Sequence, residues 1–300
     1  MGDLHRQIEL FGRAAVVRDQ PERRSVIDVA ANFMADETID RGFTHSLFCL
    51  TVLPRKQRAD DEVWSRENGR IRLTIQPLAD ENGTKLGVPY GSTARYMMLY
   101  LQTEAIRLGS PEVRLGKSMH GWLAAMGLST GGKSYNWVAA QAARIERSVV
   151  TFTHTGEDGV ARWQDTIIRG SFDPRSRETE RVVRLSESFY DALLRHPVPV
   201  QEGALRHLRN RCLALDIYLW LAYRLHVIPD DSLLLRWPAI QAQFGMPGQK
   251  SFHFKADFLK ELEYACAVYP EARLEVEPTG LRLFKSPPPS PARPKLVFVK

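Results

Sequence analysis

The amino-acid sequence predicts an α+β fold with tandem winged helix-turn-helix domains, a charged N-terminal leader and a Pro-rich basic C-terminal tail. Residues 113–171 carry the patterns of a short strand, a short helix, a tight turn, a longer helix and a β-hairpin, which is the element order of a winged helix. The same order returns over residues 233–284, and both turns end in Lys-Ser, at 133–134 and 250–251. We interpret the two stretches as divergent copies of one module.

The composition indicates a folded protein with a polyanionic partner. The chain has 300 residues, is 44% hydrophobic and carries a net charge of +6, which excludes wholesale disorder. Its three cysteines lie far apart, which excludes a disulfide scaffold and a zinc site and fits a reducing compartment. No run approaches the ~20 apolar residues of a membrane span. We expect a cytoplasmic protein with no catalytic residues, no metal and no cofactor.

Charge and hydrophobicity divide the chain into four segments. The leader, residues 1–44, is rich in acidic residues and is expected to be flexible. The first winged-helix domain is expected over residues 45–200 and the second over 201–286. Residues 287–300 form a Pro-rich, basic tail that is expected to be extended.

Local patterns justify the elements of the first domain in chain order. The apolar run at 46–53 predicts a buried strand, and the alternation of Ile71 with Ile75 predicts a half-exposed strand over 70–76. Apolar residues then recur at helical spacing until Gly109, which ends that helix. The later elements are a strand at 113–115, helices at 117–126 and 134–147, and hairpin strands at 149–155 and 163–171.

The second domain is predicted in the same way. Pro238 suits the first turn of a short helix, and Phe254, Phe258 and Leu262 mark the inner face of a longer one. The connection between the domains holds a strand at 182–185, a helix beginning at Ser186, a break at 197–199 and one bent or two separate helices over 204–226. The domain itself comprises a strand at 233–235, helices at 238–244 and 251–268, and hairpin strands at 273–277 and 281–284.

The longer helix of each module is the predicted DNA-reading element, because the first turn of such a helix reaches base edges in the major groove. Lys suits guanine or phosphate, Asn and Gln suit adenine, and Ser suits either base. Trp137 could stack on a base, but it is expected in the core. The predicted DNA contacts are Lys133, Ser134, Tyr135, Asn136, Arg144, Arg147, Gln249, Lys250, Ser251, His253 and Lys260. The candidates for phosphate contacts are Arg206, Arg209, Arg211, Arg282 and Lys285.

A P-loop ATPase is an alternative function. Residues 127–134, GLSTGGKS, satisfy the phosphate-binding pattern G-x-x-x-x-G-K-[ST], and Asp216 after four apolar residues would bind Mg²⁺. Such a loop must follow a buried strand. The residues before Gly127 have helical periodicity instead, so we regard the match as accidental.

Four segments of the chain carry a family resemblance, and they are VPYGSTARYMMLYLQTEAIRLGSPEVRLGK (88–117), GWLAAMGLSTGGKSYNWVAAQAARI (121–145), LALDIYLWLAYRL (213–225) and YPEARLEVEPTGLRL (269–283). In this order they resemble segments of the RepA-type plasmid replication initiators. The resemblance implies two winged-helix domains, no enzymatic activity, binding to repeated sites (iterons) in the double-stranded DNA of an origin, and promotion of origin opening. It also implies recruitment of the host initiator and replicative helicase, and both monomeric and homodimeric forms. We expect dimerisation through the first domain. A winged-helix transcriptional repressor without initiator activity is the alternative of the same architecture.

A short pattern in the leader suggests another partner. Gln7-Ile8-Glu9-Leu10-Phe11 is similar to the peptide with which many bacterial proteins bind the sliding clamp. Leu10 and Phe11 would fill an apolar pocket of the clamp while Gln7 anchors the peptide by hydrogen bonds. An amphipathic docking helix explains the same residues equally well.

Overall fold

The computed structural model describes residues 3–37, 40–115, 119–127, 130–157, 159–169 and 182–289. Most of the predicted Pro-rich tail lies outside these ranges, as do residues 128 and 129 of the Gly-rich turn and the end of the predicted strand at 163–171.

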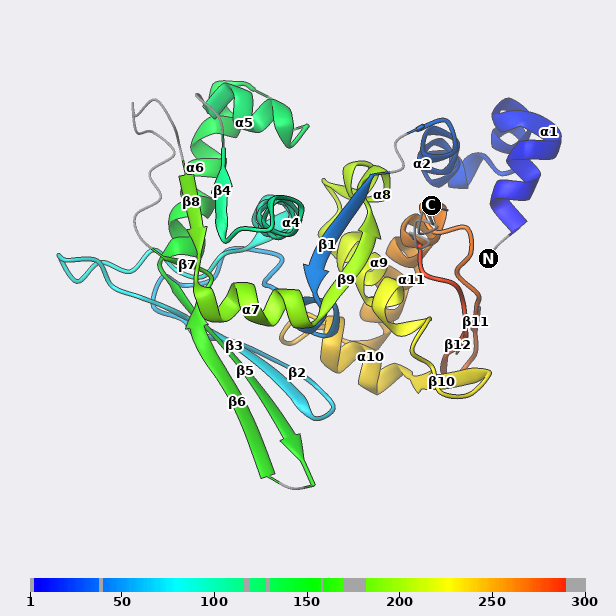
Figure 1. The fold of residues 1–300 in the computed structure, drawn as a ribbon. Helices are drawn as coiled ribbons and strands as arrows, with labels where there is room; N and C mark the ends of the chain where they lie inside the picture. The colour runs from blue at the N-terminus through cyan, green and yellow to red at the C-terminus, as the bar shows by residue number, and fades with distance from the viewer. Residues whose placement is uncertain are drawn as a thin grey trace, which may run out of the picture.

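The chain folds into a mixed α+β arrangement (Figure 1). The helices are α1 (Asp3–Asp19), a 3-10 helix η1 (Pro21–Arg23), α2 (Arg24–Met34), α3 (Ser46–Leu50), α4 (Gly91–Leu108), α5 (Met119–Ala125), α6 (Gly132–Glu146), α7 (Glu187–Arg195), α8 (Glu202–Leu208), α9 (Cys212–Arg224), α10 (Trp237–Phe244) and α11 (Ser251–Ala267). The strands are β1 (Arg41–His45), β2 (Trp64–Asn68), β3 (Ile71–Pro77), β4 (Glu112–Arg114), β5 (Ser148–Gly156), β6 (Gly159–Thr166), β7 (Ile168–Arg169), β8 (Val182–Leu185), β9 (Pro197–Gln201), β10 (Ser232–Arg236), β11 (Leu274–Val276) and β12 (Gly280–Phe284).

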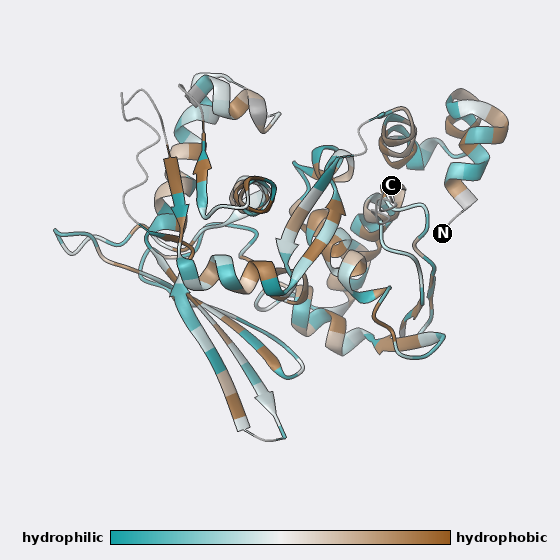
Figure 2. Cartoon of the chain, in the orientation of Figure 1, coloured by the Kyte–Doolittle hydropathy of each residue, from teal (hydrophilic) through white to brown (hydrophobic). Residues whose placement is uncertain are grey.

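Both predicted element orders occur in the structure. The first is β4, α5, α6 and the hairpin β5–β6, and the second is β10, α10, α11 and the hairpin β11–β12. Gly109 ends α4 as predicted, in the left-handed conformation that glycine adopts without strain. Hydrophobic and hydrophilic residues alternate along the hairpin β5–β6 (Figure 2).

The two hairpins pair differently with the strands around them. In the C-terminal copy, β10 pairs with the hairpin in the antiparallel order β10-β12-β11. In the N-terminal copy, the hairpin instead joins the sheet β2-β3-β5-β6, while β4 pairs with β8 in the sheet β4-β8-β7. The partner strands β2 and β3 precede the hairpin by about 80 residues in the sequence, so local patterns carry no signal for this pairing.

The N-terminal segment differs from the expected flexible leader. Residues 3–34 form α1, η1 and α2, and α2 buries Ile27, Ala30 and Phe33. The ring of His5 is hydrogen-bonded through Nε2 to the carbonyl oxygen of Ala267 at 2.9 Å, and α2 packs on α11. The apolar spacing within this charged segment therefore decides its structure, because it gives the helices a face to bury.

Two local predictions were wrong. Residues 46–50 form the short helix α3 instead of a strand, and its first turn is capped by His45, whose Nδ1 accepts the backbone N–H of Leu47 at 3.1 Å. A short apolar run fits a buried helix or a buried strand equally well, and here packing against α9 selects the helix. The expected break at residues 197–199 is part of β9, which pairs antiparallel with β1. Proline is tolerated at the edge of such a two-stranded sheet.

A buried ion pair joins the two halves of the chain. Arg95 of α4 donates from Nε and Nη2 to the two carboxylate oxygens of Asp216 in α9, at 2.6 and 2.8 Å. The same guanidinium donates to the backbone carbonyls of Leu53, Pro54 and Gly91. The two side chains are only 4% and 6% exposed. Burial raises the pKa of Asp216, and the adjacent Arg95 guanidinium opposes that shift.

Removing one partner of this pair is expected to destabilise the protein. Asp216→Asn should lower the free energy of unfolding by about 3–5 kcal/mol, because it leaves the Arg95 guanidinium buried without its counter-charge. Denaturant unfolding measures the change. As a control, Arg184→Gln breaks the exposed pair with Glu187 and should cost about 0–1 kcal/mol. Equal costs for the two variants would contradict a structural role for the pair.

Candidate nucleic-acid interface

The first turn of α6 presents polar side chains on the surface. Lys133 and Asn136 are exposed, and Ser134 and Tyr135 are half-buried. The positive end of the helix dipole lies at this turn, which favours anions there. The opposite side of α6 buries Val138, Ala142 and Ile145, as the sequence predicted.

The two predicted arginines at the end of this helix are held by the protein itself. Arg144 donates from Nη1 to the carbonyl oxygen of Ala140, and its guanidinium lies over the ring of Tyr90, 5.4 Å from the ring centroid. Arg147 forms an ion pair with Asp80 at 3.5 Å. Each therefore already has a partner within the chain.

Trp137 is a correction to the sequence analysis. It is 45% exposed instead of lying in the core, and its ring meets the ring of Tyr90 edge-on at a centroid distance of 5.5 Å. Helical periodicity cannot separate a rim position from a core position when both lie beside the apolar stripe.

The first turn of α11 is more exposed than that of α6. Lys250, Ser251, His253 and Lys260 are all exposed. Among the residues that the structure describes, no side chain caps this turn. The inner face of the helix buries the predicted set, which is Phe254, Phe258, Leu262 and Ala265.

Gln249 holds the turn before α11 instead of pointing freely outward. Its Oε1 accepts the backbone N–H of Met246 at 3.0 Å, and its Nε2 donates to Asp257 at 2.9 Å. Its backbone carbonyl accepts from Gln241. These three contacts shape the turn, so an adenine contact from Gln249 would require it to exchange partners.

Four of the five candidates for phosphate contacts already have partners within the chain. Arg206 lies 3.4 Å from Asp36, and Arg209 donates to the carbonyl oxygen of Gly127 at the turn before α6. Arg211 pairs with Glu261 at 2.9 Å and covers the ring of Tyr264, and Arg282 pairs with Glu277. The fifth, Lys285, is exposed.

Two features of this surface were missed by sequence reasoning. The first is Phe252, in the first turn of α11, which is 80% exposed. The sequence does not indicate this exposure, because other aromatic residues of the same helix are buried. The second feature is the basic run Arg-Lys-Gln-Arg at residues 55–58, which contacts residues near α6 and residues near α11. Gln57 accepts a hydrogen bond from Tyr90 beside α6, and Arg55 donates to the carbonyl of Phe244 at the end of α10. The charge run itself was a signal that could have found this segment.

The structure removes the context that a P-loop requires. Gly127 follows the helix α5 instead of a strand. Asp216 is buried in the ion pair with Arg95, so its carboxylate is not placed to bind Mg²⁺. Within the described ranges, no three His, Cys, Asp or Glu side chains gather as metal ligands. None of the helices described is long and apolar enough to cross a membrane.

The predicted clamp-binding residues lie in a helix. Leu10 and Phe11 are 65% and 67% exposed on α1, while Ile8 is buried. The amide of Gln20 donates to Oε1 of Gln7 at 3.0 Å. Both large apolar side chains are therefore available on the surface, whereas the glutamine is held within the N-terminal helices.

Comparison with known proteins gives a family and a fold. Residues 88–235 match the family described as "Plasmid encoded RepA protein". A crystal structure of domain 2 and domain 3 of RctB has a TM-score of 0.52 at 12% identity, and the match covers 79% of this chain and 94% of that one. A second crystal structure of RctB domains 2–3 has a TM-score of 0.49 at 11% identity, over 80% and 96% of the two chains. No curated protein sequence matches this chain.

Proposed function

We propose that this chain, whose residues 88–235 belong to the family of plasmid-encoded RepA proteins, is a non-enzymatic plasmid replication initiator. In this proposal two winged-helix domains, over residues 45–200 and 201–286, bind repeated sites in the origin duplex. The fold similarity to the RctB domains covers 79% of this chain, a larger share than residues 88–235 of the family match, which supports a relationship that is wider than the matched residues.

The observation that carries the proposal is the match between two exposed helix starts. Lys133 and Ser134 follow Gly132, the first residue of α6, and Lys250 and Ser251 are the N-cap and the first residue of α11. An aromatic residue follows in both, Tyr135 or Phe252, and then a polar one, Asn136 or His253. Lys and Asn have the donors and acceptors that read guanine and adenine, and an exposed aromatic ring suits the thymine methyl group.

The net charge of +6 is modest, and several arginines already have partners within the chain. We therefore assign much of the discrimination between DNA sequences to the few side chains at the starts of α6 and α11. Phosphate contacts position a protein on DNA, whereas base contacts select the sequence. Lys285 and Lys56, which are both exposed, are the phosphate contacts that we favour, because Arg55 and Arg58 of the same basic segment already have partners in Phe244 and Glu62. The four paired arginines Arg206, Arg209, Arg211 and Arg282 are partnered in the same way.

The protein partners follow from the family. We infer recruitment of the host initiator and the replicative helicase, together with a homodimer formed through the first domain. The exposed pair Leu10 and Phe11 supports a further contact with the sliding clamp.

Substitutions in the first turn of α11 are expected to weaken specific DNA binding. A footprint on the DNA flanking the gene would identify the duplex, and fluorescence anisotropy would then compare it with a scrambled duplex. Lys250→Ala, Ser251→Ala and Phe252→Ala should each cost roughly 1–3 kcal/mol on the specific duplex, with a smaller effect on the scrambled one. Arg18→Ala, an exposed change in α1, is the control. Wild-type affinity in all three variants would rule out α11 as a recognition helix.

Strand opening separates an initiator from a repressor. We expect the protein, together with the host initiator, to expose thymines to permanganate in an AT-rich duplex beside the bound repeats, because an initiator prepares the origin for helicase loading. A repressor would protect its own site and leave the neighbouring thymines unreactive. That second result, obtained with protein that binds the repeats tightly, would favour the repressor.

Clamp binding has an equally direct test. The double change Leu10→Ala with Phe11→Ala should weaken binding to a bacterial sliding clamp by about tenfold or more, because both side chains would fill the clamp pocket. Surface plasmon resonance on immobilised clamp measures this. Both residues are exposed, so folding should be unaffected, and Arg6→Ala serves as the exposed control. Unchanged affinity would remove the clamp from the list of partners.

A further inference from the structure

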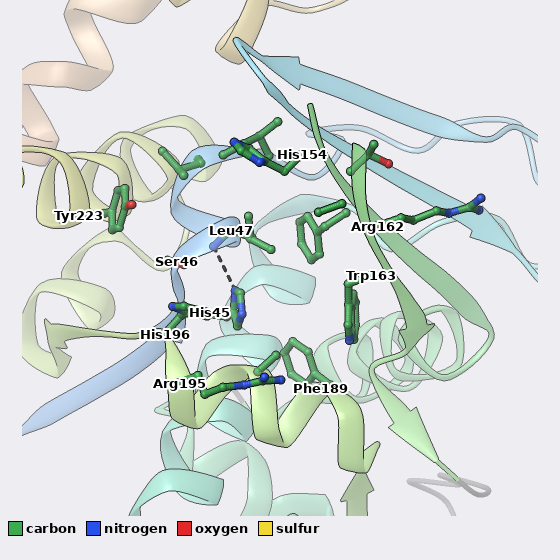
Figure 3. A pocket seen from close by; sticks show the side chains of 16 residues that line it. His45, Ser46, Leu47, His154, Arg162, Trp163, Phe189, Arg195, His196 and Tyr223 are labelled. Carbon is green, nitrogen blue, oxygen red and sulfur yellow. Dashed lines mark hydrogen bonds between the residues drawn. The ribbon is translucent and has the colours of Figure 1, made fainter. Parts of the chain in front are cut away.

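A cavity of about 670 Å³ opens between the hairpin β5–β6 and the helices α3, α7 and α9 (Figure 3). Its volume lies in the range of small-molecule sites. Two of its lining residues, His45 and Phe189, are only 3% and 1% exposed, so side chains of the core form its floor.

The cavity has a continuous aromatic wall. The rings of His45 and Phe152 are stacked with centroids 6.2 Å apart, Phe152 and Trp163 are 5.8 Å apart, and Trp163 and Phe189 are 6.0 Å apart. These rings come from β1, β5, β6 and α7, so the wall exists only in the folded chain. It suits a flat or elongated apolar body.

One buried N–H group of this wall, on Trp163, lacks an acceptor among the described residues, and the ring of His45 carries a second N–H. Nδ1 of His45 accepts the backbone N–H of Leu47, so the proton of the neutral ring lies on Nε2. Burial, with help from His196 and Arg195, lowers the pKa of His45 to about 4, which keeps this ring neutral near pH 7. Nε1 of Trp163 is buried without a hydrogen-bond partner among the described residues.

Among the described residues that line the cavity, the charged side chains are Arg162 and Arg195, and both are cationic. Arg195 lies beside Phe189 and His45 in Figure 3. None of the described residues that line the cavity is Asp or Glu. A site that offers cations and N–H donors beside an apolar wall is complementary to a ligand with an apolar body and an anionic head.

We propose that this cavity binds a small organic carboxylate, with its apolar body against the half-buried Trp163, which packs on Phe152 and Phe189, and with its carboxylate at Arg195. The volume of the cavity, about 670 Å³, suits a small molecule. The inference concerns a face formed by α3, α7, α9 and the hairpin, and it does not rest on DNA binding by α6 or α11.

Ligand-observed NMR with phenylbutyrate tests the proposal. We expect saturable binding to the full chain, and weaker binding of phenylbutanol, which has the same apolar body without the carboxylate. Arg195→Gln should raise the Kd of phenylbutyrate about tenfold, the size of one charge-assisted hydrogen bond. Ala192→Leu, which fills the cavity from α7, should raise it comparably.

The controls keep the outcome decisive. Arg236→Gln removes an exposed arginine outside the cavity and should leave the Kd unchanged, and thermal melting shows that each variant is folded. The proposal is overturned if phenylbutyrate does not saturate, if phenylbutanol binds equally well, or if Arg195→Gln binds like wild type. Saturable binding of an acidic peptide without any binding of phenylbutyrate would also overturn it and assign the cavity to a protein partner.

Discussion

The buried pair of Arg95 and Asp216 is the interaction on which the rest of the structure depends. Arg95 makes five hydrogen bonds, two to Asp216 and three to backbone carbonyls at residues 53, 54 and 91. It thereby fixes α4, α9 and the chain after α3 relative to one another. Such a pair tolerates little displacement, because an unpaired charge in the core is costly.

The position of both candidate DNA-reading helices follows from this constraint. α6 packs on α4, and α11 packs on α9, so the ion pair between α4 and α9 links the supports of the two helices. The arginines Arg144, Arg209 and Arg211 then shape the surroundings of these helices through contacts with Tyr90, Gly127 and Tyr264. These arginines stabilise the fold through those contacts, and exposed residues such as Lys133 and Lys250 are the remaining candidates for recognition.

Local patterns predicted most of the elements because periodicity and turn residues act over a few positions. The inner faces of α6 and α11 and the stop at Gly109 are cases of this kind. The errors occurred where a short pattern has two solutions. The apolar run at 46–50 became a helix, and Trp137, beside the apolar stripe of α6, lies at the surface. In both cases a neighbour distant in the sequence made the choice.

The sequence alone predicted most of the helices and strands, the pair of Lys-Ser helix starts and the resemblance to plasmid RepA proteins, whose family model matches residues 88–235, because these depend on residue types at short spacing. The tertiary structure decided which charged side chains have a partner within the chain. It placed Asp216 against Arg95, gave four of the five phosphate candidates acidic or carbonyl partners, and drew His45, Trp163 and Arg195 from three separate elements around one cavity. Those contacts join residues far apart in the chain, and no local pattern encodes such distances.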